Sequence, residues 1–166
     1  KILKEGDVVS LDLGLKYKNF YTDMAITVPV GRANSQAKKL IEKTKKSLEK
    51  GIKAVKEGKQ IGDIGYAIQT YVYKNGFSVV RNLVGHGVGY AAHEEPEIPN
   101  FGRKGTGEIL REGMVLAIEP MITAGGLELV LDKDKWTWKT KDGSLAAHFE
   151  HTVAITKKGA EILTCV

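Results

Sequence analysis

The 166-residue sequence has a single cysteine, Cys165, so it can form no internal disulfide and offers no cysteine-based zinc site. It has no apolar run near the roughly 18 residues of a membrane span, and its start, KILKEGDVV, lacks the basic and then apolar order of a signal peptide. Repeats, low-complexity tracts and interdomain linkers are also missing. At 42% hydrophobic residues, the chain can bury a core of its own. We therefore expect residues 1–166 to form one domain, in the cytoplasm and without a membrane partner.

The net charge of +5 raises the question of a nucleic-acid partner. Residues 38–59 hold nine lysines against three glutamates, so this one segment carries the whole excess. Apolar residues recur there in steps of three and four, which predicts an amphipathic helix over 35–56, capped by Asn34 or Ser35. The lysines then form its solvated face, and we expect no specific nucleic acid. A ribosome-docking or RNA-docking surface is the alternative.

The remaining pattern predicts an α/β fold. Residues 8–28 alternate as a β-hairpin turning near Asn19, and a second helix is expected from an N-cap at Asp63 to a stop at Gly76. Further strands are predicted in the segments FSVV (77–80), MVLAIEPMI (114–122), LELVLD (127–132), KWTWKT (135–140) and HFEHTVAIT (148–156).

Two aspartates stand in the predicted hairpin, although aspartate is depleted in strands. Asp12 has the opposite parity to its leucine neighbours, and Asp23 lies opposite or diagonal to it, at a Cβ separation of about 5–8 Å. Two such charges repel unless a cation lies between them. The alternative is a pair of exposed strand aspartates.

Glu119 and Glu150 are each the lone acid in an apolar strand segment, a place where an unpaired charge is rare. The alternative is that each glutamate lies on an edge strand and faces water. His86 lies in the glycine-rich stretch GHGVG, whose glycines allow the backbone to crowd against a site. Four carboxylates balance the charge of two divalent cations, and one imidazole completes a set rich in hard oxygen ligands. The set predicts a two-metal site.

These five residues, in SLDLGL, FYTDMA, GHGVG, AIEPM and FEHT, resemble in order and spacing the metal ligands of the methionine aminopeptidases, and HEEPEIPNF is similar to the sequence around that family's second histidine. The likeness runs from Lys4 to Leu163. It implies a pita-bread fold: a curved antiparallel sheet with helices on its outer face, here with the first half truncated. Only 31 positions separate Glu119 from Glu150, which resembles the type I members.

The resemblance also implies roles. Asp23 and Glu150 would bridge two divalent ions (Co, Mn, Fe or Zn), Asp12 would chelate one of them, and His86 with Glu119 would hold the other. Glu119 would also shuttle a proton during hydrolysis of the peptide bond.

Outside the ligand set, His93 would contact the substrate as a catalytic histidine, and Trp136 would border the pocket for methionine. Ala92 replaces a larger residue that type I members often carry, which makes a strict methionine preference less secure. The implied substrates are the N-termini of nascent polypeptides, which the protein would reach through transient contact with the ribosome. The protein would be a monomer. We assign Glu94 and Glu95 to the turn before Pro96.

Three alternatives stand beside this interpretation. X-Pro aminopeptidases and prolidases share the fold and the ligands, but carry a shorter motif than HEEPEIPN. Because the chain starts at Lys1, we expect the upstream part of a longer protein to be missing, and this piece would then bind metal and catalyse poorly. A binding module of the same fold is the non-enzymatic alternative. The other two histidines differ in parity: His148 can face the cleft with Glu150, whereas His151 is expected to be buried or supporting.

Overall fold

The computed structural model describes residues 2–165. The helices are α1 (Ser35–Ala54) and α2 (Ile61–Lys74). The strands are β1 (Val8–Tyr17), β2 (Phe20–Pro29), β3 (Ser78–Val79), β4 (Gly85–Gly87), β5 (Glu94–Ile98), β6 (Val115–Ile118), β7 (Met121–Thr123), β8 (Leu129–Leu131), β9 (Trp138–Thr140), β10 (Ala146–His148), β11 (Glu150–Thr156) and β12 (Gly159–Ile162).

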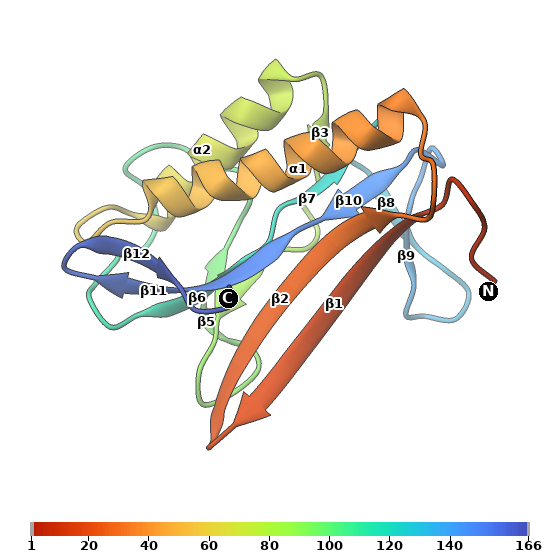
Figure 1. The fold of residues 1–166 in the computed structure, drawn as a ribbon. Helices are drawn as coiled ribbons and strands as arrows, with labels where there is room; N and C mark the ends of the chain where they lie inside the picture. The colour runs from red at the N-terminus through yellow and green to blue at the C-terminus, as the bar shows by residue number, and fades with distance from the viewer. Residues whose placement is uncertain (1, 166) are drawn as a thin grey trace.

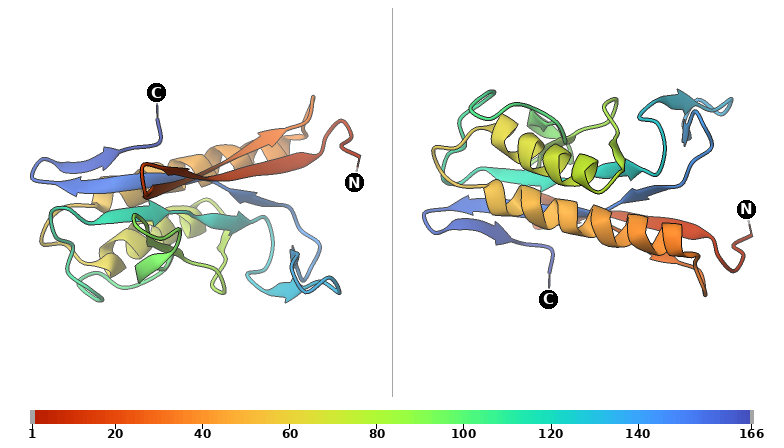
Figure 2. Two further views of the ribbon diagram at one scale, coloured as in Figure 1. Left: turned by 90° about the horizontal axis from the view of Figure 1, so that it is seen from below. Right: turned by 90° about the horizontal axis from the view of Figure 1, so that it is seen from above.

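The strands form one large curved sheet and two small ones, all antiparallel within the described residues (Figure 1). The large sheet runs β1-β2-β11-β6-β4-β5, and β12 pairs with β11. The small sheets are β10-β7-β3 and β8-β9. Both helices lie on the same side of the strands (Figure 2) and pack against each other. The expected α/β fold, a curved antiparallel sheet with helices on its outer face, is confirmed.

The hairpin of β1 and β2 matches its prediction closely. Tyr17 pairs with Phe20, which leaves a two-residue turn. Lys18 and Asn19 both adopt positive φ, at 46° and 71°. Turns of this kind follow the right-handed twist of the strands, so the hairpin stays regular over ten residue pairs.

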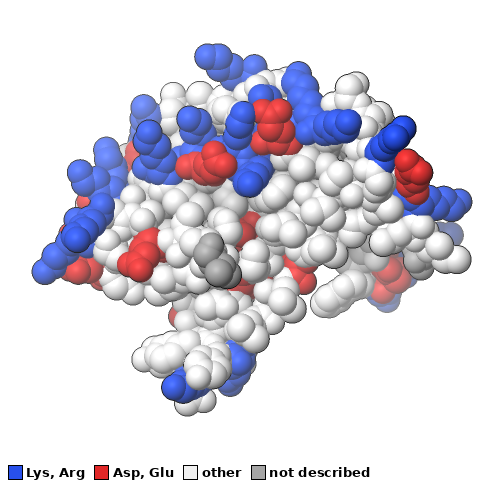
Figure 3. Space-filling model, in the orientation of Figure 1, with Lys and Arg blue, Asp and Glu red and all other residues white. Residues whose placement is uncertain are grey.

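Helix α1 begins where the cap signal placed it, because the Asn34 side chain accepts a hydrogen bond from the Ala37 amide at 2.8 Å. Its apolar face is buried, with Leu40 and Leu48 packed against the core. The opposite face carries the lysines, which gather over the helices in Figure 3. The predicted amphipathic helix is confirmed.

Helix α2 begins earlier than predicted. Its N-cap is Gln60, and Asp63 is instead the third helical residue, whose carboxylate accepts the Gln60 amide at 2.9 Å. This is a capping box, in which the side chain of the third helical residue accepts a hydrogen bond from the backbone amide of the N-cap residue. The end was placed correctly, since Gly76 follows the cap residue Asn75 with φ of 79°.

Two predicted strands are each broken in two. MVLAIEPMI divides into β6 and β7, with Glu119 and Pro120 between them, and HFEHTVAIT divides into β10 and β11 at Phe149. At both places the chain leaves one sheet for another. Pro120 has no amide to continue a ladder, and its carbonyl accepts the Phe149 amide at 3.4 Å. The two crossings therefore lie side by side.

Three strands were not predicted from the sequence. β4, β5 and β12 have no alternating pattern long enough to indicate a strand, and β5 includes Glu94 and Glu95, which we expected in a turn. Neither helix in the described part of the chain combines the length and the apolar character that a membrane crossing requires.

Candidate metal centre

Three neighbouring strands bring the acids of the hairpin to Glu150. Ala25 on β2 is the register partner of Asp12 on β1 and also of Glu150 on β11. Side chains in register share a face of the sheet, so the two carboxylates flank the small side chain of Ala25. Asp23 lies two residues from Ala25 and shares its parity. Thr152 fixes its backbone, because the hydroxyl accepts from the Asp23 amide and donates to its carbonyl, both at 2.8 Å.

The β4–β6 side of the sheet supplies His86 and Glu119. His86 on β4 pairs with Ala117 on β6, two residues before Glu119. Its Nδ1 lies 2.8 Å from the Gly87 carbonyl, which makes Nδ1 the protonated nitrogen. Nε2 is then free to bind a cation, and it lies 3.5 Å from Oε1 of Glu119. This is the tautomer that a metal ligand needs.

Close packing of the backbone explains two of the glycines around His86. A Cβ on Gly85 would lie 2.4 Å from the Ala117 carbonyl oxygen, and one on Gly87 would lie 2.3 Å from that of Glu95. At both positions a side chain would push β4 away from its neighbours. Gly89 differs, since the atom nearest to a Cβ placed there would be 3.6 Å away, in the Glu94 side chain.

Four of the five predicted ligands fall into two groups that share Glu150. In one group, His86, Glu119 and Glu150 each offer a ligand atom within 4.8 Å of the others, and in the second the members are Asp12, His148 and Glu150. A third group joins Asp23 and His86 to His93. All five predicted ligands are therefore gathered at one place, where two cations can share carboxylates.

The chemistry of this place fits divalent cations. Asp23 Oδ1 and Glu150 Oε1 are buried and have no hydrogen-bond partner among the described residues. Burial, followed by the charges of Glu119, Asp23 and Asp12, raises the pKa of Glu150 to about 9. Burial and the charge of Asp12 also raise the pKa of Asp23. Bound cations would reverse both effects, because they favour the charged form of a neighbouring carboxylate.

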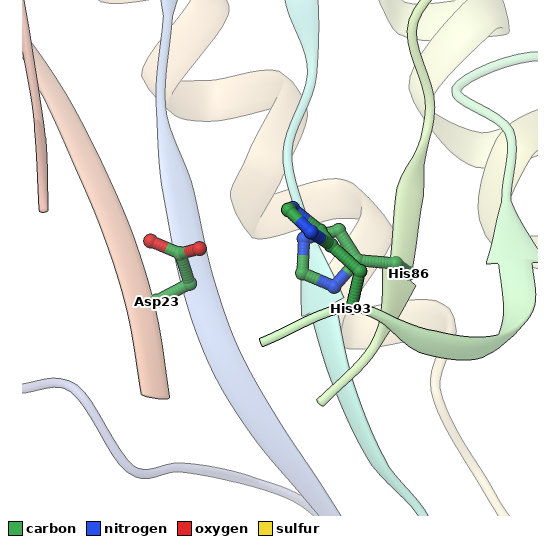
Figure 4. Close-up of side chains that lie close together, drawn as sticks. All are labelled: Asp23, His86 and His93. Carbon is green, nitrogen blue, oxygen red and sulfur yellow. The ribbon is translucent and has the colours of Figure 1, made fainter. Parts of the chain in front are cut away.

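His93 lies at the open side of the group. Its ring stands edge-on to that of His86, with centroids 4.3 Å apart, and its side chain is exposed. Figure 4 shows both imidazoles across from the carboxylate of Asp23. Behind His93, the Glu94 carboxylate accepts the Ala91 amide at 2.5 Å and ties the loop to β5. An exposed imidazole beside buried ligands suits contact with a substrate.

Trp136 is not brought to this cluster by any contact within the described residues. It follows the turn between β8 and β9, where Asp134 accepts its amide at 2.9 Å, and 85% of its surface is exposed. Its role beside a pocket stays a prediction. His151 packs away from the acids, with Nδ1 2.9 Å from the Thr164 hydroxyl, as its parity predicted.

Comparisons with known proteins point to a metallopeptidase family. Residues 1–157 match metallopeptidase family M24. The chain is 49% identical over 166 residues to methionine aminopeptidase 1 of Bacillus subtilis, covering all of this chain and 67% of that protein. The crystal structure of methionine aminopeptidase from Thermotoga maritima superposes with a TM-score of 0.98 at 51% identity, over 100% of this chain and 67% of that one.

A prolidase is a more distant neighbour. The structure of the Pyrococcus horikoshii enzyme gives a TM-score of 0.79 at 28% identity, over 100% of this chain and 42% of the prolidase. The chain spans 60 to 67% of the length of the curated relatives it matches first.

Proposed function

The chain belongs to metallopeptidase family M24, and we propose that it acts as a methionine aminopeptidase, removing the N-terminal methionine of proteins whose second residue is small. The pair of ligand groups that share Glu150 is the observation that carries this proposal. The 47–52% identity to relatives named methionine aminopeptidase supports the choice of substrate. Residues 1–166 act as one catalytic domain of the pita-bread fold.

Two divalent ions, of cobalt, manganese, iron or zinc, would be held at this centre. His86 and Glu119 would hold one ion, Asp12 would hold the other, and Asp23 and Glu150 would contribute carboxylate oxygens to the pair. Such ions supply Lewis-acid activation of water and of the scissile carbonyl. Burial of Glu150 keeps bulk water from screening the ligands, since only 2% of its surface is exposed.

Glu119 and His93 act on the substrate. Glu119 is largely buried, and each of its two carboxylate oxygens lies near a histidine. It accepts the proton of the attacking water and passes it to the leaving amine. The exposed N–H of His93 donates a hydrogen bond to the scissile peptide as negative charge develops.

Selectivity for the first residue rests on two further positions. Trp136 borders the methionine side chain, for which an aromatic ring is a favourable neighbour. Ala92 is exposed in the loop before His93 and is smaller than the residue that type I members often carry there, so side chains bulkier than methionine would also be accepted.

The substrates are nascent polypeptides in the cytoplasm, and the protein acts as a monomer in transient contact with the ribosome. The exposed lysines of α1 support this contact, since the only nearby ion pairs there join Glu42 to Lys43 and Lys46 among the described residues. Most of the positive charge of the helix therefore remains available to phosphates.

The test is the release of free methionine from Met-Ala-Ser and Met-Lys-Ser by the chain supplied with Mn²⁺ or Co²⁺, with Ala-Pro-Ser as the competing substrate. We expect cleavage of Met-Ala-Ser at least about tenfold faster than Met-Lys-Ser, because a larger second residue is excluded.

Preference for Ala-Pro-Ser would instead assign the chain to the X-Pro aminopeptidases, which share this fold. Two-ion binding without cleavage of any of the three peptides would identify a metal-binding piece that lacks part of its catalytic machinery.

A further inference from the structure

His148 lies inside the cluster of acids, although it is not one of the five predicted ligands. It is the last residue of β10, and the chain crosses to β11 directly after it. Its Nε2 lies 3.3 Å from Oε2 of Glu119, and its Nδ1 lies 3.8 Å from Oδ2 of Asp12. Only 15% of its side chain is exposed. The imidazole therefore stands between one acid from each of the two ligand groups.

The Nε2 atom is buried without a hydrogen-bond partner among the described residues. Glu119 is close, but the geometry at 3.3 Å is not that of a hydrogen bond. A buried nitrogen without a hydrogen-bond partner is destabilising, so such an atom in a native site calls for a partner. Glu150 Oε1 is buried and unsatisfied in the same way.

These atoms lie close enough together for one cation to gather them. Asp12, His148 and Glu150 each offer a ligand atom within 4.8 Å of the other two. First-row divalent cations bind imidazole nitrogen and carboxylate oxygen at about 2.0–2.2 Å, so small side-chain rotations bring the three atoms around one ion. The neighbouring group, with His86 and Glu119, has the same composition of one imidazole, one carboxylate of its own and the shared Glu150.

We propose that His148 is a sixth metal ligand, which binds the ion held by Asp12 and gives each ion of the pair one imidazole. This inference rests on the two-ion centre proposed above and extends it. An added nitrogen ligand favours cobalt, iron and zinc over magnesium and manganese, because imidazole binds borderline cations better than hard ones. The ion on the Asp12 side is then held about as firmly as its neighbour.

The test compares His148→Gln with the wild-type chain by calorimetric titration of the metal-free protein with Co²⁺. We expect two ions bound by the wild type, and a loss of at least about 100-fold in affinity for one of them in His148→Gln, which exceeds the effect usual for groups outside the ligand set. His151→Gln is the matched control, because this neighbouring histidine bonds to Thr164 and should keep both affinities.

A spectroscopic readout separates a ligand from a supporting residue. Imidazoles bound to Co²⁺ give strongly shifted, solvent-exchangeable proton signals, and His148→Gln should lose one of them. His148→Glu provides a rescue: a carboxylate at this position should restore the second ion and shift its preference toward Mn²⁺. If His148→Gln fails to fold, the wild-type Co²⁺ protein still decides the question, because two bound imidazoles give two such signals and His86 alone gives one.

Two outcomes would overturn the proposal. If His148→Gln binds both ions with wild-type affinity and only its turnover falls, His148 positions Glu119 and is not a ligand. If the wild-type chain binds fewer than two ions, the two-ion centre itself is wrong, which the wild-type titration shows before any variant is considered.

Discussion

Asp12 and Asp23 are diagonal neighbours across the β1–β2 hairpin, because Asp23 is the register partner of Gly14 and Asp12 that of Ala25. No side chain stands opposite Asp23, and a Cβ on Gly14 would lie 3.9 Å from both of its carboxylate oxygens. The two acids therefore have open space between them on one face of the sheet. Repulsion across this space raises the pKa of Asp23, after the effect of its burial.

Asp23→Ala should abolish binding of the ion pair, because this carboxylate would contact both ions. The expected result is a loss of at least about 100-fold in affinity for one ion, with the other weakened, measured by calorimetric titration with Mn²⁺ or Co²⁺. Glu161→Ala, an exposed acid on β12, is the control and should bind both ions normally. Two normal sites in Asp23→Ala would show that the ligand set is misassigned.

His86→Ala and His93→Ala should fail in different ways. Loss of His86 removes a buried nitrogen ligand, so metal affinity should fall. Loss of His93 should leave both ions bound and lower kcat by about 10²- to 10³-fold, as expected for one hydrogen bond to a developing negative charge. Metal titration and steady-state kinetics on Met-Ala-Ser measure the two effects. Equal loss of metal from both variants would make His93 a ligand.

Gly85→Ala should weaken metal binding without removing any ligand. Its new methyl group would collide with the Ala117 carbonyl and displace His86, at a cost of about 1–3 kcal/mol in the free energy of unfolding. Gly89→Ala is the matched control in the same motif, because its Cβ meets nothing closer than 3.6 Å. Chemical denaturation and metal titration should separate the variants, and identical behaviour would mean that β4 is less constrained than its packing indicates.

Leu13→Lys should reduce aggregation and leave stability nearly unchanged. Leu11, Leu13 and Leu15 are 53%, 67% and 59% exposed, on a strand that pairs only with β2 within residues 2–165. Such an apolar edge strand promotes association, and a lysine there opposes it. Light scattering should show less association, with the free energy of unfolding within about 0.5 kcal/mol of wild type. Leu116→Lys, at a position 1% exposed, is the contrast and should unfold the protein.

Local pattern was enough to predict the hairpin and both helices. Interactions between residues close in sequence determine the alternating strands around Asp12 and Asp23 and the two-residue turn between them. The same is true of the Asn34 cap of α1. The capping box of α2 was misread, because Asp63 fits the signature of a first cap as well as that of a third helical residue.

The five candidate ligands could be proposed from the sequence, and Glu119 and Glu150 among them because a lone acid in an apolar strand is costly to bury unless a cation or a partner offsets its charge. Their meeting place was decided by tertiary structure. Glu119 and Glu150 lie where two strands cross between sheets, and the bond from the Phe149 amide to the Pro120 carbonyl that joins these crossings spans 29 positions. No periodicity encodes such a contact. His148 lies among the acids, as its shared parity with Glu150 predicted, and its Nδ1 comes within 3.8 Å of Asp12 Oδ2 where the chain crosses between the two sheets.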